Sequence, residues 1–233
     1  YYSAGVTGVL SEMFRLPEWN NYGKLRFSYA QVGNDVSEFV TQIPQAKFGS
    51  GLLEINNSGV FEGLALKPEI SGSYELGYEG RFVNNRLNVD IALYKTNTKN
   101  QYFSFEGPVG LLNTNVLLNA GDVENKGLEI ALNFDVFEGD KFSWKTGFNF
   151  TANRNKVLKL HPKLSERYPI GGNFNVLRLN GSFGDFWAKT FLRNEAGKMM
   201  VSTEDSIPLS GPDGYIGNSN PKALVGWNNT FSF

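Results

Sequence analysis

Apolar and polar residues alternate along most of the chain, and this period-2 pattern is typical of β-strands that have one apolar face. The clearest example is KGLEIALNFDVF, in which Leu128, Ile130, Leu132 and Phe134 lie on one face and Glu129, Asn133 and Asp135 lie on the other. Similar alternation elsewhere predicts about eight strands, at roughly 1–11, 24–32, 71–83, 86–105, 121–137, 141–156, 176–193 and 222–233.

The connections between these strands differ in length in a regular way. Tight turns are expected at Asn84–Asn85 and at Glu138–Asp140. Long connections separate the resulting hairpins, at 33–71, 106–120 and 158–175. Short turns at one end of the strands and long loops at the other are typical of outer-membrane β-barrels, so we expect the long connections to face outside the cell.

A soluble β-sandwich with one buried face would show the same alternation, and it remains the alternative, as a carbohydrate-binding module. Two features favour the barrel. The long loops fall at one end only, and aromatic residues gather near strand ends, as the interfacial girdles of a membrane barrel require. These aromatics are Tyr74, Phe82, Phe142, Trp144, Trp227 and Phe233.

Composition excludes several other classes of protein. The 233 residues have a net charge of −1, without the basic excess of a nucleic-acid binder. The absence of cysteine and the single histidine, His161, exclude disulfides, thiolate sites and multi-histidine metal sites. The sequence has no run of 18 apolar residues and none of the common catalytic or cofactor-binding motifs. We therefore expect no catalysis, no cofactor and no transmembrane helix.

Three long segments, in order, resemble the SusC/RagA-type TonB-dependent outer-membrane transporters. They are LKPEISGSYELGYEGRFVNNRLNVDIALYKTNTKNQ at 66–101, NAGDVENKGLEIALNFDVFEGDKFSWKTGFNFTANRNKVLKL at 119–160, and GNSNPKALVGWNNTFSF at 217–233. The resemblance covers nearly the whole chain. It implies a segment of a barrel of about 22 strands, whose lumen a plug domain fills.

The resemblance also implies a function. Transporters of this type import a large nutrient, often a glycan or a peptide, with energy delivered through TonB and beneath a SusD-like lipoprotein. Residues 1–233 correspond to part of the barrel domain only, without the plug, so we expect an antiparallel transmembrane sheet that is open rather than closed. The isolated segment is not expected to transport, and its immediate partner would be outer-membrane lipid.

Polar residues on the predicted strands are interpreted as the lining of the barrel lumen. Glu75 and Glu79 would lie about 13 Å apart along one strand, which is too far for a pair of glycosidase carboxylates. The expected lumen-facing residues are Glu75, Glu79, Arg81, Glu129, Asn133 and Asp135.

One aromatic segment, NGSFGDFWAKTF, is a candidate ligand contact. Phe186 and Trp187 could stack on the apolar face of a sugar ring while Asp185 accepts hydrogen bonds from hydroxyl groups. Strand packing or an interfacial girdle would explain the same residues, so both interpretations stay open.

Overall fold

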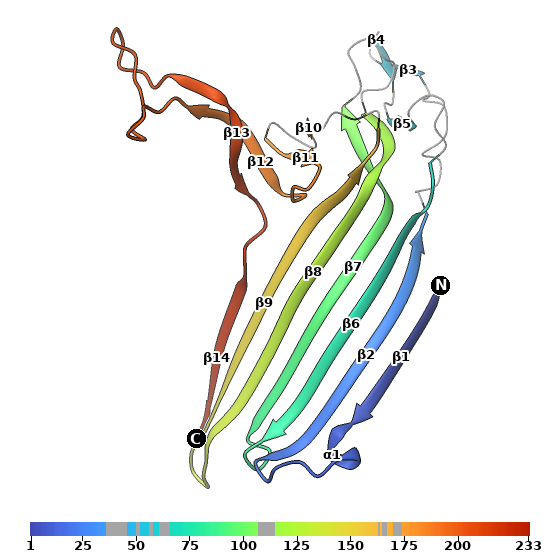
Figure 1. Ribbon diagram of the computed structural model, residues 1–233, viewed down its shortest axis with the longest axis vertical. Helices are drawn as coiled ribbons and strands as arrows, with labels where there is room; N and C mark the ends of the chain where they lie inside the picture. The colour runs from blue at the N-terminus through green and yellow to red at the C-terminus, as the bar shows by residue number, and fades with distance from the viewer. Residues whose placement is uncertain are drawn as a thin grey trace.

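The computed structural model describes residues 1–35, 46–49, 52–55, 58–60, 66–106, 115–162, 164, 167–169 and 174–233. These residues build a long, single-layered sheet with smaller hairpins at one end (Figure 1). The order along the sheet is β1, β2, β6, β7, β8, β9, β14, and β5 pairs with β8. The strands are β1 (Tyr2–Val9), β2 (Asn20–Asn34), β5 (Ser58–Val60), β6 (Glu69–Phe82), β7 (Leu87–Glu106), β8 (Asn115–Glu138), β9 (Ser143–Leu160) and β14 (Leu224–Ser232).

The sheet is open, as the sequence predicts. Among the described strands, β1 pairs only with β2 and β14 only with β9, so the first and last strands do not close a barrel. All neighbours along this order are antiparallel, whereas the short β5 runs parallel to β8. The antiparallel strands expected from the alternation and the open barrel segment expected from the family resemblance are therefore confirmed.

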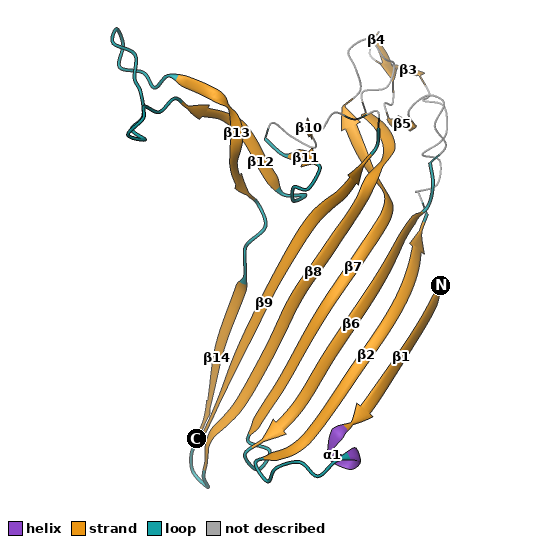
Figure 2. Cartoon of the chain, in the orientation of Figure 1, coloured by secondary structure: helices purple, strands orange, loops and turns teal. Residues whose placement is uncertain are grey.

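The tight turns lie at one end of the sheet, and the described parts of the long connections lie at the other (Figure 2). In the β6–β7 turn, Val83, Asn84 and Asn85 all have left-handed backbone angles, with φ of 53°, 55° and 63°. The β8–β9 turn is closed by the Gly139 N–H, which donates to the Phe142 carbonyl at 3.0 Å. Both predicted tight turns are confirmed, and the one-turn helix α1 (Leu10–Met13) lies at the same end.

The opposite end holds the described parts of the long connections, including β3 (Ala46–Gly49) and β4 (Leu52–Ile55). Each of the predicted connections, 33–71, 106–120 and 158–175, also contains residues that lie outside the described ranges. Within the described part of the chain, no helix has both the length and the apolar character needed to span a membrane.

The predicted seventh strand, 176–193, is wrong. It divides into β11 (Val176–Arg178), which pairs with β10 (Arg167–Pro169), and β12 (Asp185–Phe191), which pairs with the unpredicted β13 (Ser210–Asn218). The chain turns between them because Asn180 has φ of 61° and the Asp185 carboxylate accepts the Ser182 N–H at 3.0 Å. Local turn chemistry here overrides the apolar spacing. The first predicted strand also ends early, at Val9, where α1 begins.

Buried apolar residues gather where β11 packs against the sheet. The cluster consists of Leu118, Ala120, Val123, Val157 and Leu177, with Phe103, Leu160, Leu164 and Tyr168 partly buried around it. Backbone hydrogen bonds attach the segment after β11 to β9, since Val157 exchanges bonds with Asn180 and Gly181 at 2.8 Å. The rest of the sheet has no comparable core within the described residues, so its stability there depends on strand pairing and on what contacts its two faces.

Candidate polar wall and loop sites

Strand register gives the sheet two chemically different faces. On one face, Leu25, Tyr78, Ile91, Ile130 and Phe150 are direct cross-strand partners on five successive strands. One residue earlier along β2, the corresponding line on the other face runs through Lys24, Glu79, Asp90, Ala131 and Asn149. The period-2 alternation of single strands thus becomes a continuous apolar face and a continuous polar face.

Ion pairs connect the strands of the polar face, which we call the polar wall. Lys24 Nζ lies 2.6 Å from Glu79 Oε2, and Arg81 lies 3.8 Å from the other oxygen of the same carboxylate. Farther along the sheet, Lys145 on β9 lies 3.2 Å from Asp135 on β8. Each pair is partly exposed, so we expect contributions below about 1 kcal/mol per pair. Their main effect is to fix the side chains in place on this face.

Arg26 makes the longest connection across the polar wall. Its guanidinium reaches over β6 and donates to both Asp90 oxygens on β7, at 3.0 and 3.2 Å, and to Glu75 at 3.3 Å. The path is open because Gly77 is the residue of β6 beneath it. A Cβ at Gly77 would overlap Arg26 Nε and would lie 2.7 Å from Arg26 Cγ.

Next to this contact the polar wall is hollowed by a cavity of about 530 Å³. Arg26, Asp90, Tyr94, Glu129 and Thr151 are among the residues that line it. Glu129 forms no ion pair with another described residue, and its side chain is exposed. The hollow therefore presents the carboxylate of Glu129, a phenol and a hydroxyl group beside Arg26 and its two carboxylate partners, Asp90 and Glu75, a set suited to hydrogen-bonding polar ligands.

All six predicted lining residues lie on the polar wall, because each falls at an alternate position of β6 or β8 on that face. They are Glu75, Glu79, Arg81, Glu129, Asn133 and Asp135. The sequence pattern missed the connection from Arg26 to Asp90. Only the pairing register brings those residues together, and no local motif marks it.

The structure places Asp185, Phe186 and Trp187 together at the start of β12, but it gives them different surroundings. The Asp185 carboxylate is buried and accepts the Ser182 N–H at 3.0 Å and the Asn218 amide at 2.8 Å. Asp185 therefore holds the base of the β12–β13 hairpin. Phe186 pairs with Gly217 in that hairpin.

Trp187 lies beside two arginines. The guanidinium carbons of Arg167 and Arg178 are 5.1 and 5.4 Å from its ring, within cation–π distance. Its indole Nε1 is buried and has no hydrogen-bond partner among the described residues. Ligand contact by Phe186 and Trp187 remains a prediction.

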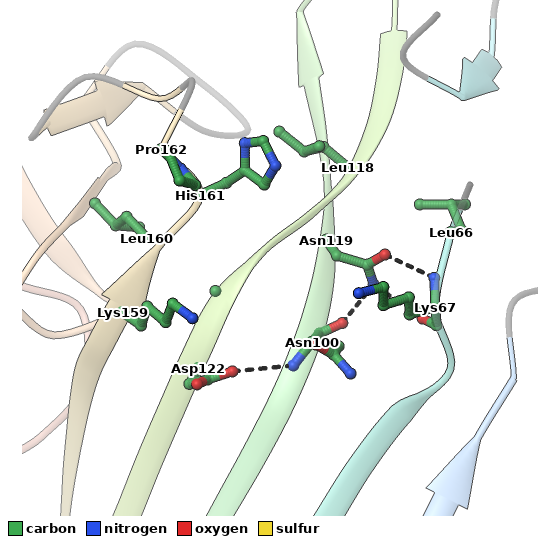
Figure 3. Close-up of a pocket in the computed structure, with 11 residues that line it drawn as sticks. Leu66, Lys67, Asn100, Leu118, Asn119, Asp122, Lys159, Leu160, His161 and Pro162 are labelled. Atoms are coloured by element: carbon green, nitrogen blue, oxygen red, sulfur yellow. Dashed lines mark hydrogen bonds between the residues drawn. The ribbon is translucent and has the colours of Figure 1, made fainter. Parts of the chain in front are cut away.

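A smaller pocket of about 250 Å³ lies at the long-connection end of the sheet (Figure 3). The Asn119 amide donates to the backbone carbonyls of Lys67 at 2.9 Å and Asn100 at 2.6 Å, and the Asn100 N–H donates to Asp122 at 3.1 Å. His161 lines the pocket, and its backbone N–H donates to Ala120 at 2.6 Å. These bonds attach residues 66–68 to the strand ends, which indicates a structural junction.

Comparisons with known proteins agree with this architecture. The family described as "TonB dependent receptor-like, beta-barrel" matches residues 2–220. TonB-dependent receptor P26 of Formosa agariphila is 27% identical over the whole chain, which covers 26% of that relative. TonB-dependent receptor SusC of Bacteroides thetaiotaomicron is 31% identical over 65% of the chain, which covers 17% of that relative.

Solved structures give the same fold. The structure titled "Structure of the RagAB peptide transporter" superposes with a TM-score of 0.79 at 16% identity, over 99% of this chain and 27% of that one. The chain spans about a quarter or less of the length of these relatives. The likeness to SusC and to the RagAB fold agrees with the SusC/RagA-type resemblance of the three motifs. The family match over residues 2–220 places the chain in the TonB-dependent receptor β-barrel family.

Proposed function

We propose that residues 1–233 form part of the barrel wall of a Gram-negative outer-membrane transporter that imports a large nutrient, such as a glycan or a peptide. In this proposal the energy comes through TonB and a SusD-like lipoprotein assists capture. The main support is an open sheet with an ion-paired polar face and an uncovered apolar face, in a chain of the TonB-dependent receptor family.

The uncovered apolar face supports a membrane location over a soluble β-sandwich. Phe27, Leu76 and Leu93 remain 43–48% exposed in the middle of their strands. No second sheet packs on this face within the described ranges. A sandwich would bury these side chains between two sheets, whereas a membrane barrel presents them to lipid.

The height of the apolar face fits a membrane. On β8 it begins near the tight-turn end at Phe137, which a register shift after Asp135 places opposite Trp144 on this face. It extends to Lys126, the first charged residue at an alternate position beyond Leu128. Eleven residues at ~3.4 Å, on a strand tilted by about 40°, rise about 29 Å. A membrane barrel needs an apolar band about 25 Å tall, so the two lengths agree.

The polar wall would then line the lumen, and the hollow beside Glu129 would face the transported molecule or the plug. At the long-connection end, Phe186 and Trp187 are proposed to contact substrate, and Asp185 would hold their hairpin in position. The relative titled a peptide transporter supports import of peptides, and the resemblance to SusC-type transporters keeps glycans as an equal candidate.

Uptake by the full-length protein tests the proposal. A strain that lacks the gene is complemented with wild-type protein, and growth is measured on panels of glycans and of peptides as the limiting nutrient. We expect growth on at least one nutrient, and loss of that growth when TonB is deleted. Growth on every nutrient without the gene, or growth that does not need TonB, would contradict the proposal.

The same charge reversal at two positions of β8 gives a matched comparison. Glu129→Lys places a cation in the hollow of the polar wall, and Glu138→Lys makes the same change at the last residue of β8, beside the tight turn at the other end. At equal amounts in the membrane, we expect Glu129→Lys alone to reduce uptake.

A further inference from the structure

Three cations stand side by side on the apolar face of the sheet. Lys95 on β7, Lys126 on β8 and Arg154 on β9 are direct cross-strand partners. Like charges directly opposite each other destabilise a sheet, so this row has a cost for folding. An anionic ligand outside the protein would remove that cost.

The protein itself neutralises only part of the row. Glu124 lies 2.8 Å from Lys95 and 3.5 Å from Lys126, and its cross-strand partner on β9 is a further cation, Lys156. Arg154 and Lys156 are exposed and form no ion pair with another described residue. Glu124 is thus the one carboxylate among four cations, and the five residues keep a formal excess of +3. We call Lys95, Lys126 and Arg154 the cationic row.

An open groove of about 490 Å³ runs beneath the cationic row on the same face. Its floor includes Phe27, Leu76, Leu93, Leu128 and Ala152, and the side chains of Lys95, Lys126 and Arg154 line its other end. The groove is therefore amphipathic along its length, apolar toward the middle of the strands and cationic toward the long-connection end.

Tyrosines continue the same line toward the N-terminal edge of the sheet. Lys95 is the cross-strand partner of Tyr74, which in turn pairs with Tyr29, and the two rings lie 4.7 Å apart. Tyrosine concentrates at membrane–water interfaces, where its ring is in lipid and its hydroxyl in the headgroup region. The tyrosines thus place the cationic row at headgroup depth, in agreement with its height of about 29 Å above Phe137.

We propose that the cationic row binds the phosphate-bearing headgroup of an anionic membrane lipid, with one of its acyl chains lying in the groove. This inference rests on the membrane location in the proposed function and adds a specific lipid partner. The occupant is a lipid because the cations and the apolar groove form one continuous surface on the face directed away from the polar wall. A free phosphate or a phosphorylated nutrient would use the cations but leave the groove unfilled.

Lipid binding by the purified full-length protein tests this inference. Wild type and the variant Lys95→Ser/Lys126→Ser/Arg154→Ser are titrated with mixed micelles of a neutral detergent and either phosphatidylglycerol or phosphatidylcholine. Removal of each cation is expected to weaken anionic-lipid binding about fivefold, so the triple variant should bind phosphatidylglycerol about a hundredfold more weakly. Phosphatidylcholine should bind weakly to both proteins.

A matched control removes the same charge elsewhere. Lys189, Lys198 and Lys222 are exposed lysines outside the main sheet, and replacing all three by serine should leave phosphatidylglycerol binding unchanged. Sodium phosphate, titrated as a competitor, tests whether the cations bind a lipid headgroup or free phosphate. We expect it to displace little lipid. If folding of the triple variant fails, the single change Lys126→Gln, with an expected loss of about fivefold, gives the same test.

The result that overturns the inference is equal binding of phosphatidylglycerol by wild type and triple variant, or an equal loss in the control. Displacement of the lipid by millimolar-range phosphate would identify a free-anion site instead. Nutrient uptake by the wild-type protein is measured in parallel. Normal uptake with no lipid selectivity rejects this inference alone, whereas absence from the membrane rejects the proposed function.

Discussion

An arginine on the apolar face of the sheet should destabilise the protein far more than an arginine on the polar wall. Ile130 lies on β8 in the apolar cross-strand line, between Ile91 and Phe150. Asn133, three residues farther along the same strand, belongs to the polar wall and is exposed. The variants Ile130→Arg and Asn133→Arg therefore place one charge in one strand on opposite faces.

The position of Ile130 sets the size of the effect. It is four residues from Lys126 and seven from Phe137, so at ~3.4 Å per residue and a tilt of about 40° it lies about 10 Å below the cationic row. This is close to the middle of an apolar band about 25 Å tall, where an arginine costs about 2–4 kcal/mol. Leu128→Arg lies about 5 Å nearer the headgroups and should cost less, toward about 1 kcal/mol.

Urea titration of the full-length protein in lipid vesicles measures these costs. The expected order of destabilisation is Ile130→Arg, then Leu128→Arg, with Asn133→Arg within about 0.5 kcal/mol of wild type, as for a surface substitution. Equal destabilisation by Ile130→Arg and Asn133→Arg would refute the assignment of the two faces. Equal destabilisation by Ile130→Arg and Leu128→Arg would refute the assigned depths of these two residues in the membrane.

Two further predictions concern backbone geometry, each measured as the unfolding midpoint of the full-length protein in detergent. Gly121→Ala should destabilise the protein by about 3 kcal/mol, because the new Cβ would overlap the Lys159 carbonyl oxygen. Gly226→Ala is the control and should be nearly neutral, because the nearest atom to its new Cβ is 3.8 Å away. Similar unfolding midpoints for the two variants would show that β8 and β9 are not so close at Gly121. Val83→Asn should stabilise the protein by about 1 kcal/mol, because a β-branched residue is strained at φ of 53° whereas asparagine tolerates that angle. An unfolding midpoint below that of the wild type would contradict the turn geometry.

Alternation along the sequence was enough to predict most of the main sheet and its two faces. A strand with one apolar face must repeat every two residues, so Leu128 to Phe134 could be assigned without knowing any neighbour. Asparagines at 84–85 marked the tight turn because asparagine tolerates left-handed backbone angles, which both residues adopt. The openness of the sheet followed from the family resemblance and not from the alternation.

Features that depend on register could not be predicted from single strands. Arg26 meets Asp90 only because Gly77 lies between them, and the cationic row forms only because Lys95, Lys126 and Arg154 align across three strands. The division of 176–193 depends on a buried hydrogen bond to Asp185, which apolar spacing does not report. The sequence therefore predicted the types of residue at the candidate sites better than their partners.

Spin-label accessibility along β8 tests the central claim, that this sheet is a membrane wall with one lipid face and one aqueous face. The 233 residues contain no cysteine. With any cysteine elsewhere in the full-length protein replaced by serine, single cysteines at positions 128–134 can each hold one nitroxide in lipid vesicles. We predict that even-numbered positions are more accessible to oxygen, which concentrates in lipid, and odd-numbered positions to a water-soluble nickel chelate. Uniform accessibility to the nickel chelate at all seven positions would contradict the account.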